Sequence, residues 1–332
     1  MQRLNDKKVL VLMPAFFDYP AAVLNAIKDC GADVAVMDER PANDFFTKIA
    51  IRLGLHFFVR KKIEDYYEAI LASSEADKLD YLLLISPETV SDSFIGRLRQ
   101  INPGMKVVMY MWDSFSNKKS ALKLLPIVDV CFSFDNSDVE RYPGLSFLPL
   151  FYRDEYRSLS CEGDKDIDIL FVGTAHSDRY RVAKAVKQQA EGVGLKVYFY
   201  FFSPSKTLFY LKRVFDKNSR GIDVRDLSFS PLSGGEILSL ISRSKVVLDI
   251  EHPGQVGLTM RSIEMLGARK KLMTTNKAVV GYDFYRPDNH ILIDRKMPDF
   301  NRDLVLSEYV EIDLKTYKKY SIHSWVETLF SS

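Results

Sequence analysis

The sequence has few cysteines and no long apolar run, and both features narrow the classes of protein it can belong to. Its three cysteines, Cys30, Cys131 and Cys161, lie far apart without paired spacing. Reduced thiols are therefore favoured over disulfides or a metal site. No stretch approaches the roughly 18 apolar residues of a membrane-spanning helix, and the apolar run near the N-terminus is too short for a signal peptide. These absences predict a cytoplasmic protein.

Strong net charge and cofactor signatures are also missing. The formal net charge is +2, from 46 basic and 44 acidic residues, so no nucleic-acid partner is expected. No GxGxxG motif follows the first apolar run, which counts against an NAD or FAD enzyme. There is also no DxD-type pair at a predicted strand end, and no His/Cys cluster with metal-ligand spacing. We therefore expect neither a cofactor nor a bound metal.

The length of 332 residues exceeds one ordinary core and fits two domains of about 150 residues each. A hydrophobic content of 47% with 27% charged residues is typical of a folded globular protein. The first domain is predicted at 1–155 and the second at 165–318, joined by a polar stretch. The final segment, 319–332, is expected to form a helix that packs back on the first domain through Trp325 and Phe330.

Short apolar runs alternate with helical patterns in both halves of the chain. In the first half, strands are predicted at 8–13, 33–37, 81–85, 106–111 and 130–134. In the second half, they are predicted at 167–172, 197–202, 227–230, 246–250 and 271–275. Strands that alternate with helices in this way predict an α/β fold of two doubly wound domains with parallel sheets.

The segment from Val246 to Asn276 is the most informative part of the sequence. A predicted buried strand is followed by a loop with one proline and two glycines, and then by a helix that carries Arg261 and Glu264. A glycine-bearing loop before a helix presents backbone N–H groups to an anion. A glutamate on that helix can accept hydrogen bonds from a sugar diol. Phosphate donors beside a diol acceptor are what a nucleotide-sugar site requires.

This segment resembles the donor-binding region of GT-B-fold glycosyltransferases, in which a glutamate on the same helix holds the nucleotide ribose. In many of those enzymes the glutamate is followed, after four residues, by Gly, any residue and Pro. With Glu264 as the ribose ligand, Arg269 stands at the glycine and Lys271 at the proline. Four further runs, YMWDS, FSFDNSD, LPLFY and FVGTAHSDR, at 110–114, 132–138, 148–152 and 171–179, resemble bacterial polysaccharide glycosyltransferases of capsule, exopolysaccharide or lipopolysaccharide clusters.

The resemblance implies two Rossmann-like domains that face each other across a cleft, with the acceptor on the first and the nucleotide sugar on the second. It also implies a reaction, in which a sugar moves from a nucleotide-sugar donor to a hydroxyl of a glycan or lipid-linked glycan during surface polysaccharide synthesis. Enzymes of this fold generally need no bound metal. Two alternatives stay open: a sugar-nucleotide epimerase of the same architecture, and a catalytically inactive GT-B-like binding subunit.

Donor-binding residues are expected at several turns of the second domain. Arg179 is the first choice for holding the diphosphate, and Arg261 and Lys271 are further positive charges that would stabilise it as it leaves. The alternative for Arg261 is an ion pair with Glu251 or Glu264. The expected donor-binding residues are Gly173, Thr174, His176, Arg179, Ser230, His252, Gln255, Gly257, Leu258, Thr259, Arg261 and Glu264.

Three carboxylates of the first domain are candidates for the catalytic base. Asp18, Glu88 and Asp113 follow predicted strands, and the carboxyl ends of parallel strands share the edge of the sheet where ligands bind. Each can act as a general base toward an acceptor hydroxyl, or can instead cap a helix or brace a loop. Asp113 is preferred because Trp112, beside it, can form a stacking wall for a sugar ring.

Two basic, aromatic segments predict peripheral contact with the cytoplasmic face of the inner membrane. Residues 45–62 contain several lysines, arginines and phenylalanines but no acidic residue, and residues 203–213 form a second basic, amphipathic pattern. Segments of this kind can lie at an anionic lipid surface. The alternative is an amphipathic helix that packs on the sheet and turns its basic face to solvent.

Overall fold

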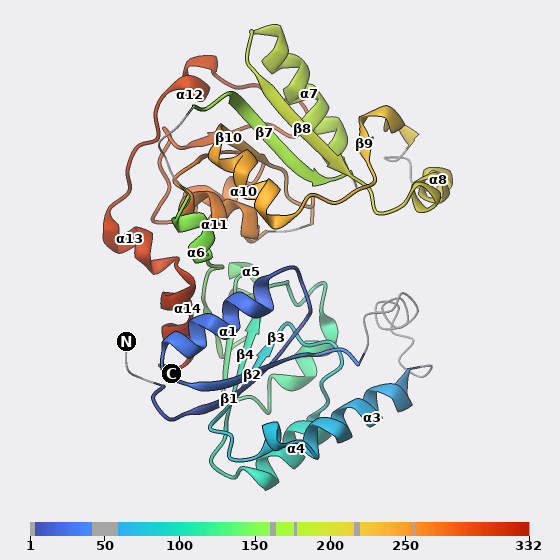
Figure 1. Ribbon diagram of the computed structural model, residues 1–332, viewed down its shortest axis with the longest axis vertical. Helices are drawn as coiled ribbons and strands as arrows, with labels where there is room; N and C mark the ends of the chain where they lie inside the picture. The colour runs from blue at the N-terminus through green and yellow to red at the C-terminus, as the bar shows by residue number, and fades with distance from the viewer. Residues whose placement is uncertain are drawn as a thin grey trace. The chain divides into compact units, whose positions relative to one another are not determined.

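The computed structural model describes residues 4–41, 59–159, 164–175, 178–215, 220–254 and 256–331. The chain divides into two compact units (Figure 1). The first unit comprises Met1–Leu150 and Ile322–Ser332, and the second comprises Phe151–Ser321. Each unit contains a 6-stranded sheet with helices around it, so the predicted α/β fold of two doubly wound parallel sheets is confirmed.

The first sheet has the strand order β2-β1-β3-β4-β5-β6, and all of its pairs are parallel. Its strands are β1 (Lys8–Met13), β2 (Asp33–Asp38), β3 (Tyr81–Ile85), β4 (Lys106–Met111), β5 (Val130–Ser133) and β6 (Leu145–Phe147). The helices of this unit are α1 (Tyr19–Asp29), α3 (Arg60–Leu71), η2 (Ser74–Ala76), α4 (Asp92–Ile101), η3 (Lys119–Leu124), α5 (Asn136–Arg141) and α14 (Ile322–Leu329). The direction of winding reverses between β1 and β3, and ligands of open α/β sheets bind outside the strand ends at such a point.

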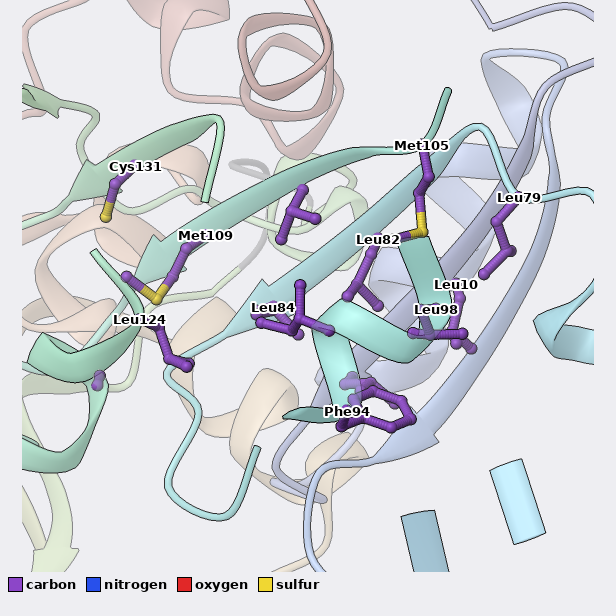
Figure 2. Close-up of a cluster of buried hydrophobic side chains, with 14 of the residues drawn as sticks. Leu10, Leu79, Leu82, Leu84, Phe94, Leu98, Met105, Met109, Leu124 and Cys131 are labelled. Carbon is purple, nitrogen blue, oxygen red and sulfur yellow. The ribbon is translucent and has the colours of Figure 1, made fainter. Parts of the chain in front are cut away.

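Alternate residues of the first sheet pack against two different helix layers. On one face, side chains from α4, including Phe94 and Leu98, cover Leu84 of β3 (Figure 2). On the other face, the ring of Tyr110 lies 5.0 Å from that of Trp325 on α14. Strands that are buried on both faces are apolar throughout, which is why these strands appear as continuous apolar runs in the sequence.

The second sheet has the order β12-β11-β10-β7-β8-β9, again with parallel pairs. Its strands are β7 (Ile167–Thr174), β8 (Val197–Phe202), β9 (Leu227–Ser228), β10 (Ser244–Asp249), β11 (Lys271–Thr274) and β12 (His290–Leu292). The helices are α6 (Asp154–Arg157), α7 (Arg179–Gly192), α8 (Lys206–Phe215), η4 (Val224–Asp226), α10 (Gly234–Ser242), α11 (Met260–Gly267), η5 (Lys277–Gly281), α12 (Arg302–Leu306) and α13 (Leu314–Lys319). Counted along the chain, this is the strand order of dinucleotide-binding folds, and its winding reverses between β7 and β10.

Gly267, the last residue of α11, lies directly against Tyr152. A β-carbon at Gly267 would come within 2.5 Å of Tyr152 Cγ. Tyr152 is 1% exposed, and its hydroxyl donates to the carbonyl of Tyr317 at 3.0 Å, so the ring cannot easily move aside. We therefore expect Gly267→Ala to lower the free energy of unfolding by about 2–3 kcal/mol, a usual cost of overpacking a core.

Denaturant unfolding of two variants tests this expectation. The matched control is Gly192→Ala at the end of α7, where a β-carbon would meet nothing within 4 Å. That control should be neutral or slightly stabilising, because alanine favours helix more than glycine does. Equal stability of the two variants would contradict the tight fit at Gly267.

Candidate functional site

The carboxyl ends of β7 and β10 lie side by side where the winding of the second sheet reverses. β7 ends with Gly173 and Thr174, two residues beyond the predicted end of that strand, and β10 ends at Asp249, which Ile250 and Glu251 follow. Ligands of open α/β sheets bind in the crevice outside such strand ends. This edge of the second sheet is the candidate donor site.

Arg179, the first residue of α7, connects the two strand ends. Its Nε donates to the carbonyl oxygen of Ile250 at 2.8 Å, and its Nη1 lies 3.4 Å from the hydroxyl oxygen of Thr174. Burial lowers the pKa of Arg179, and neighbouring arginines lower it further while nearby carboxylates oppose the shift. A guanidinium remains charged in proteins. Arg179 therefore places a fixed positive charge where the sheet reverses.

Arg295 belongs to the same cluster, although nothing in the sequence motif predicts it. Its Nη1 lies 2.7 Å from Asp178 Oδ1, and its Nη2 lies 2.6 Å from Glu251 Oε1. The Nη2 group also donates to the backbone carbonyl of Glu251 at 2.8 Å. Only its position in the sequence could have indicated this role. Arg295 closely follows the apolar run 291–293, which contains most of the short strand β12, and ligand-binding residues often follow a strand.

Asp249 fixes the start of α11 beside the end of β10. Its Oδ2 accepts hydrogen bonds from the hydroxyls of Thr259 and Ser262, the latter at 2.9 Å. Thr259 Oγ1 in turn accepts from the backbone N–H of Ser262 at 3.2 Å, as an N-cap residue does. The Thr259 hydroxyl, expected to bind the donor, is therefore engaged in holding the helix end in position.

Glu264 is buried on α11 beside Arg261. The Arg261 Nε lies 3.5 Å from Glu264 Oε2, so the ion pair left open by the sequence is present. The Glu264 side chain is only 6% exposed. Burial raises the pKa of Tyr156 on α6. The negative charge of Glu264, which lies near Tyr156, raises this pKa further. Since a carboxylate can accept about four hydrogen bonds, Glu264 can accept hydrogen bonds from ligand hydroxyls in addition to its ion pair with Arg261.

The loop between β10 and α11 is held in place by Asn276, whose Nδ2 donates to the carbonyl of Gly257 at 3.1 Å. Leu258 is 1% exposed, so its side chain packs in the core and only its backbone can face a ligand. His252 is exposed, and its Nδ1 accepts from the N–H of Gly254 at 3.2 Å. This loop therefore offers backbone groups and one imidazole to the site.

One other residue expected to bind the donor contributes less to this arrangement. Ser230 is exposed just beyond β9, where its carbonyl accepts a hydrogen bond from the hydroxyl of Tyr200. His176 and Gln255 lie outside the described residues.

The prediction that Lys271 neutralises donor phosphate is wrong. Lys271 is the first residue of β11, and the amino end of a parallel strand lies at the edge of the sheet opposite to the ligand site. Its ammonium donates to the carbonyl of Leu304 at 2.8 Å and to the hydroxyl of Ser307. Burial lowers the pKa of Lys271. This lysine therefore anchors the segment around α12.

Arg269 forms a turn at the end of α11 that normally favours glycine. The N–H groups of Arg269 and Lys270 donate to the carbonyls of Leu266 and Met265 at 3.1 and 3.0 Å, which is the Schellman pattern at a helix end. The pattern places Arg269 at a φ of 49°, a conformation that is strained for any residue with a β-carbon. Its guanidinium lies 4.7 Å from the ring centroid of Tyr317, a contact that offsets part of this strain. This turn is thus formed without glycine.

In the first unit, Glu88 lies in a network of ion pairs after β3. Arg40 Nη2 lies 2.9 Å from one of its oxygens, and the Lys118 ammonium bonds to the other. Burial alone would raise the pKa of Glu88, but the hydrogen bond and charge of Lys118, together with Arg40, outweigh burial and lower it. Glu39, which is fully buried, accepts the backbone N–H groups of Glu88 and Thr89. These contacts make Glu88 a poor proton acceptor and a brace for its loop.

Asp18 and Asp113 form no ion pair with any described residue, unlike Glu88. Asp18 is exposed at the start of α1, and its side chain makes no capping hydrogen bond. Asp113 Oδ1 accepts from the N–H of Ser114 at 3.0 Å and from the side chain of Asn117 at 2.9 Å. Its Oδ2 has no hydrogen-bond partner within the described part of the chain. Asp113 is therefore the candidate base with an open acceptor oxygen.

Among the described residues, no group of three or more His, Cys, Asp and Glu side chains is arranged to hold a metal ion. No helix in the same part of the chain is long and apolar enough to cross a membrane. Segment 203–213 includes part of α8, where Tyr210 and Leu211 are exposed, and 45–58 lies outside the described residues. Peripheral membrane contact stays a prediction.

No protein-family model matches the sequence, and no curated protein matches it either. Several solved structures share the fold. Anabaena HepE, in complex with UDP and glucose, is 9% identical, with 98% of this chain and 100% of that chain covered and a TM-score of 0.57. Sucrose-phosphate synthase from Thermosynechococcus elongatus is 9% identical, with 98% and 95% covered and a TM-score of 0.54. UDP-GlcNAc 2-epimerase from Methanocaldococcus jannaschii is 9% identical, with 98% and 99% covered and a TM-score of 0.51. At such identities the similarity shows the GT-B fold alone.

Proposed function

We propose that the chain is a glycosyltransferase that moves a sugar from a nucleotide-sugar donor to a hydroxyl of a glycan or lipid-linked glycan in bacterial surface polysaccharide synthesis. The observation that carries this proposal is the cluster of arginines around Arg179 where the winding of the second sheet reverses, with Glu264 nearby on α11. Guanidinium groups hold phosphates by paired hydrogen bonds, and a buried carboxylate can accept hydrogen bonds from a ribose diol. HepE, of similar fold, binds UDP and glucose, which supports a donor of this class.

In the proposed reaction, an acceptor hydroxyl attacks the anomeric carbon of the donor. The bond from that carbon to the diphosphate oxygen breaks, and the nucleoside diphosphate leaves with the electron pair. Arg179 and Arg261 stabilise the negative charge that develops on it. Asp113 is the first choice for taking the hydroxyl proton, because its Oδ2 is open, and Asp18 is the second.

An epimerase acting on a nucleotide sugar is the second candidate. The similarity to UDP-GlcNAc 2-epimerase favours keeping it, because that enzyme has the same fold. The two candidates differ in what they need: an epimerase changes the donor sugar without any acceptor. Incubation with the nucleotide sugar alone, followed by analysis of the sugar, distinguishes them.

A nucleotide screen with the purified chain tests the proposed donor site. The melting temperature is measured with UDP, GDP, CMP, dTDP, ADP and NAD, since a ligand that binds only the folded state raises it. We expect a selective rise with one nucleotide and no rise with NAD. Glu264→Ala should weaken the affinity for that nucleotide by about 10- to 100-fold, because hydrogen bonds to a charged group are lost.

The matched control for this variant is Glu191→Ala, which removes an exposed glutamate from α7 in the same unit. Its affinity for the nucleotide should equal that of the wild-type chain. Normal affinity in Glu264→Ala would show that the donor site is misplaced. Absence of binding by the wild-type chain to all of the nucleotides would overturn the proposed function.

A further inference from the structure

Four aromatic rings gather at the carboxyl edge of the first sheet and leave the outer rings in solvent. Phe16 and Phe17 follow β1, Tyr19 begins α1, and Trp112 follows β4. The ring centroid of Phe16 lies 4.7 Å from that of Phe17 and 6.4 Å from that of Trp112. Phe16 and Phe17 are 49% and 77% exposed, whereas Tyr19, which supports Trp112 at 5.9 Å, is 4% exposed. We call these four residues the aromatic platform.

Two strained backbone positions hold the aromatic platform in place. Phe17 has a φ of 45° and Ser86 a φ of 44°, in the left-handed region that residues with a β-carbon rarely adopt. Ser86 follows β3 and is fully buried, and its Oγ accepts the backbone N–H of Trp112 at 2.9 Å. Strain of this kind persists where the surrounding structure enforces it, and it concentrates at ligand sites.

The aromatic platform also occupies the position where the topology places a ligand. Its residues follow β1 and β4, and the supporting Ser86 follows β3, which lies between those strands in the sheet. The winding of the first sheet reverses between β1 and β3, so its ligand crevice is expected outside these strand ends. A ligand that covers these exposed rings removes apolar surface from water, which favours binding.

The residues beside the rings indicate what kind of ligand would cover them. Asp18 directly follows Phe17 and Asp113 directly follows Trp112, so each of the two loops that carry the rings also carries a carboxylate. A pyranose ring has an apolar face of C–H bonds that packs on aromatic carbon, and hydroxyls at its edge that donate to carboxylates. A lipid chain would match the rings but would remove the carboxylates from water without giving them hydrogen bonds.

We propose that the aromatic platform binds a sugar ring of the acceptor, an inference that rests on the proposed glycosyl transfer. In this proposal, the rings of Phe16, Phe17 and Trp112 recognise a cyclic sugar. Asp113, and Asp18 on the other loop, then accept hydrogen bonds from hydroxyls of that sugar. The acceptor is therefore recognised by the apolar face of its terminal ring.

Tryptophan fluorescence of the full chain tests this proposal. The chain contains 2 tryptophans, and Trp325 is 1% exposed, so a change of emission on sugar binding reports on Trp112. The probes are methyl β-D-glucoside, methyl β-D-galactoside, N-acetylglucosamine and maltose, with acyclic sorbitol for comparison. We expect a saturable change with at least one cyclic sugar and none with sorbitol. Trp112→Phe should abolish the signal.

Two phenylalanine variants make the test specific to the aromatic platform. Phe17→Ala should weaken the affinity for the sugar by about 3- to 10-fold, since one aromatic contact is lost. The control is Phe147→Ala on β6, a ring in the same unit that is 39% exposed, and it should leave the affinity unchanged. If Phe17→Ala does not fold, as judged by its melting temperature, Phe16→Ala takes its place.

Each outcome bears on one proposal or the other. If no cyclic sugar changes the emission while a nucleotide still raises the melting temperature, the sugar-binding role of the aromatic platform is wrong and the proposed function stands. The same holds if Phe17→Ala and Phe147→Ala bind sugar equally well. If vesicles of phosphatidylglycerol and phosphatidylcholine change the emission and sugars do not, the rings are a membrane contact, which also overturns the proposal. Sugar binding without any nucleotide binding would instead overturn the glycosyl transfer.

Discussion

Replacing Arg295 by methionine is expected to lower the free energy of unfolding by about 3 kcal/mol, the usual cost of removing one partner from a buried ion pair. The guanidinium lies 2.7 Å from Asp178 and 2.6 Å from Glu251, and Glu251 is only 8% exposed. Without Arg295, the Glu251 carboxylate loses its cationic partner in a place that water barely reaches. Nucleotide affinity should fall as well, because one of the positive charges near Arg179 is lost.

Urea unfolding and calorimetric titration with the nucleotide measure the two effects. The control is Arg243→Met, which removes an arginine whose pair with Asp166 is exposed, at 49% and 41% for the two side chains. Exposed pairs contribute less than about 1 kcal/mol, and this control should bind nucleotide normally. In Arg295→Met combined with Glu251→Gln, part of the lost stability should return. A loss in Arg295→Met no larger than in the control would contradict the buried network.

Glu39→Leu should destabilise the first unit by about 3–5 kcal/mol, because it leaves several buried polar groups without an acceptor. Glu39 is 0% exposed, and its carboxylate accepts from the N–H groups of Glu88 and Thr89 at 3.1 and 3.0 Å. Its other oxygen lies 3.0 Å from Arg40 Nε. Leucine fills the space but accepts no hydrogen bond, so the backbone N–H groups of this loop stay unpaired.

The pH dependence of the same variant gives a second check. Burial raises the pKa of Glu39 above its ordinary value of 4.5, so the folded state binds this proton more tightly than the unfolded state. The contribution of Glu39 to the free energy of unfolding is then complete below pH 4.5. It is lost as the pH rises through the pKa of Glu39 in the folded state. The difference between wild-type and Glu39→Leu should therefore grow as the pH falls toward 4.5. The control Glu64→Leu, at a side chain that is 55% exposed, should cost little at any pH.

The central strands and the edge strands β2 and β9 could be predicted from the sequence, whereas the edge strands β6 and β12 could not. β1, β3, β4 and β10 are apolar because both faces are buried, and that pattern is local. The edge strands β6 and β12 have 3 residues each. Such short strands are determined by pairing with a neighbour, as Leu145 pairs with Cys131, and a local pattern carries little information about such pairing.

Some residues of the candidate site could likewise be predicted from the sequence, and others could not. Arg261, Glu264 and Thr259 lie within one turn-and-helix motif, so their types and spacing alone make them candidates for one site. Arg295 meets Asp178 across 117 positions of sequence, and only the folded sheet brings that pair together. The error at Lys271 has a similar origin, since a family pattern gives the position of a residue but not the edge of the sheet at which its side chain lies.

The return of α14 to the first unit has a consequence for how the protein is made. Phe151–Ser321 is continuous in sequence, whereas the first unit needs Ile322–Ser332 as well as Met1–Leu150. Trp325, which covers Tyr110 at 5.0 Å, is synthesised after the whole of the second unit. On the ribosome, domains generally fold as they emerge, yet here the first half to emerge waits with the apolar surface around Tyr110 uncovered. The nascent first unit is therefore the stage at which a chaperone would matter most, although its sequence leaves the ribosome first.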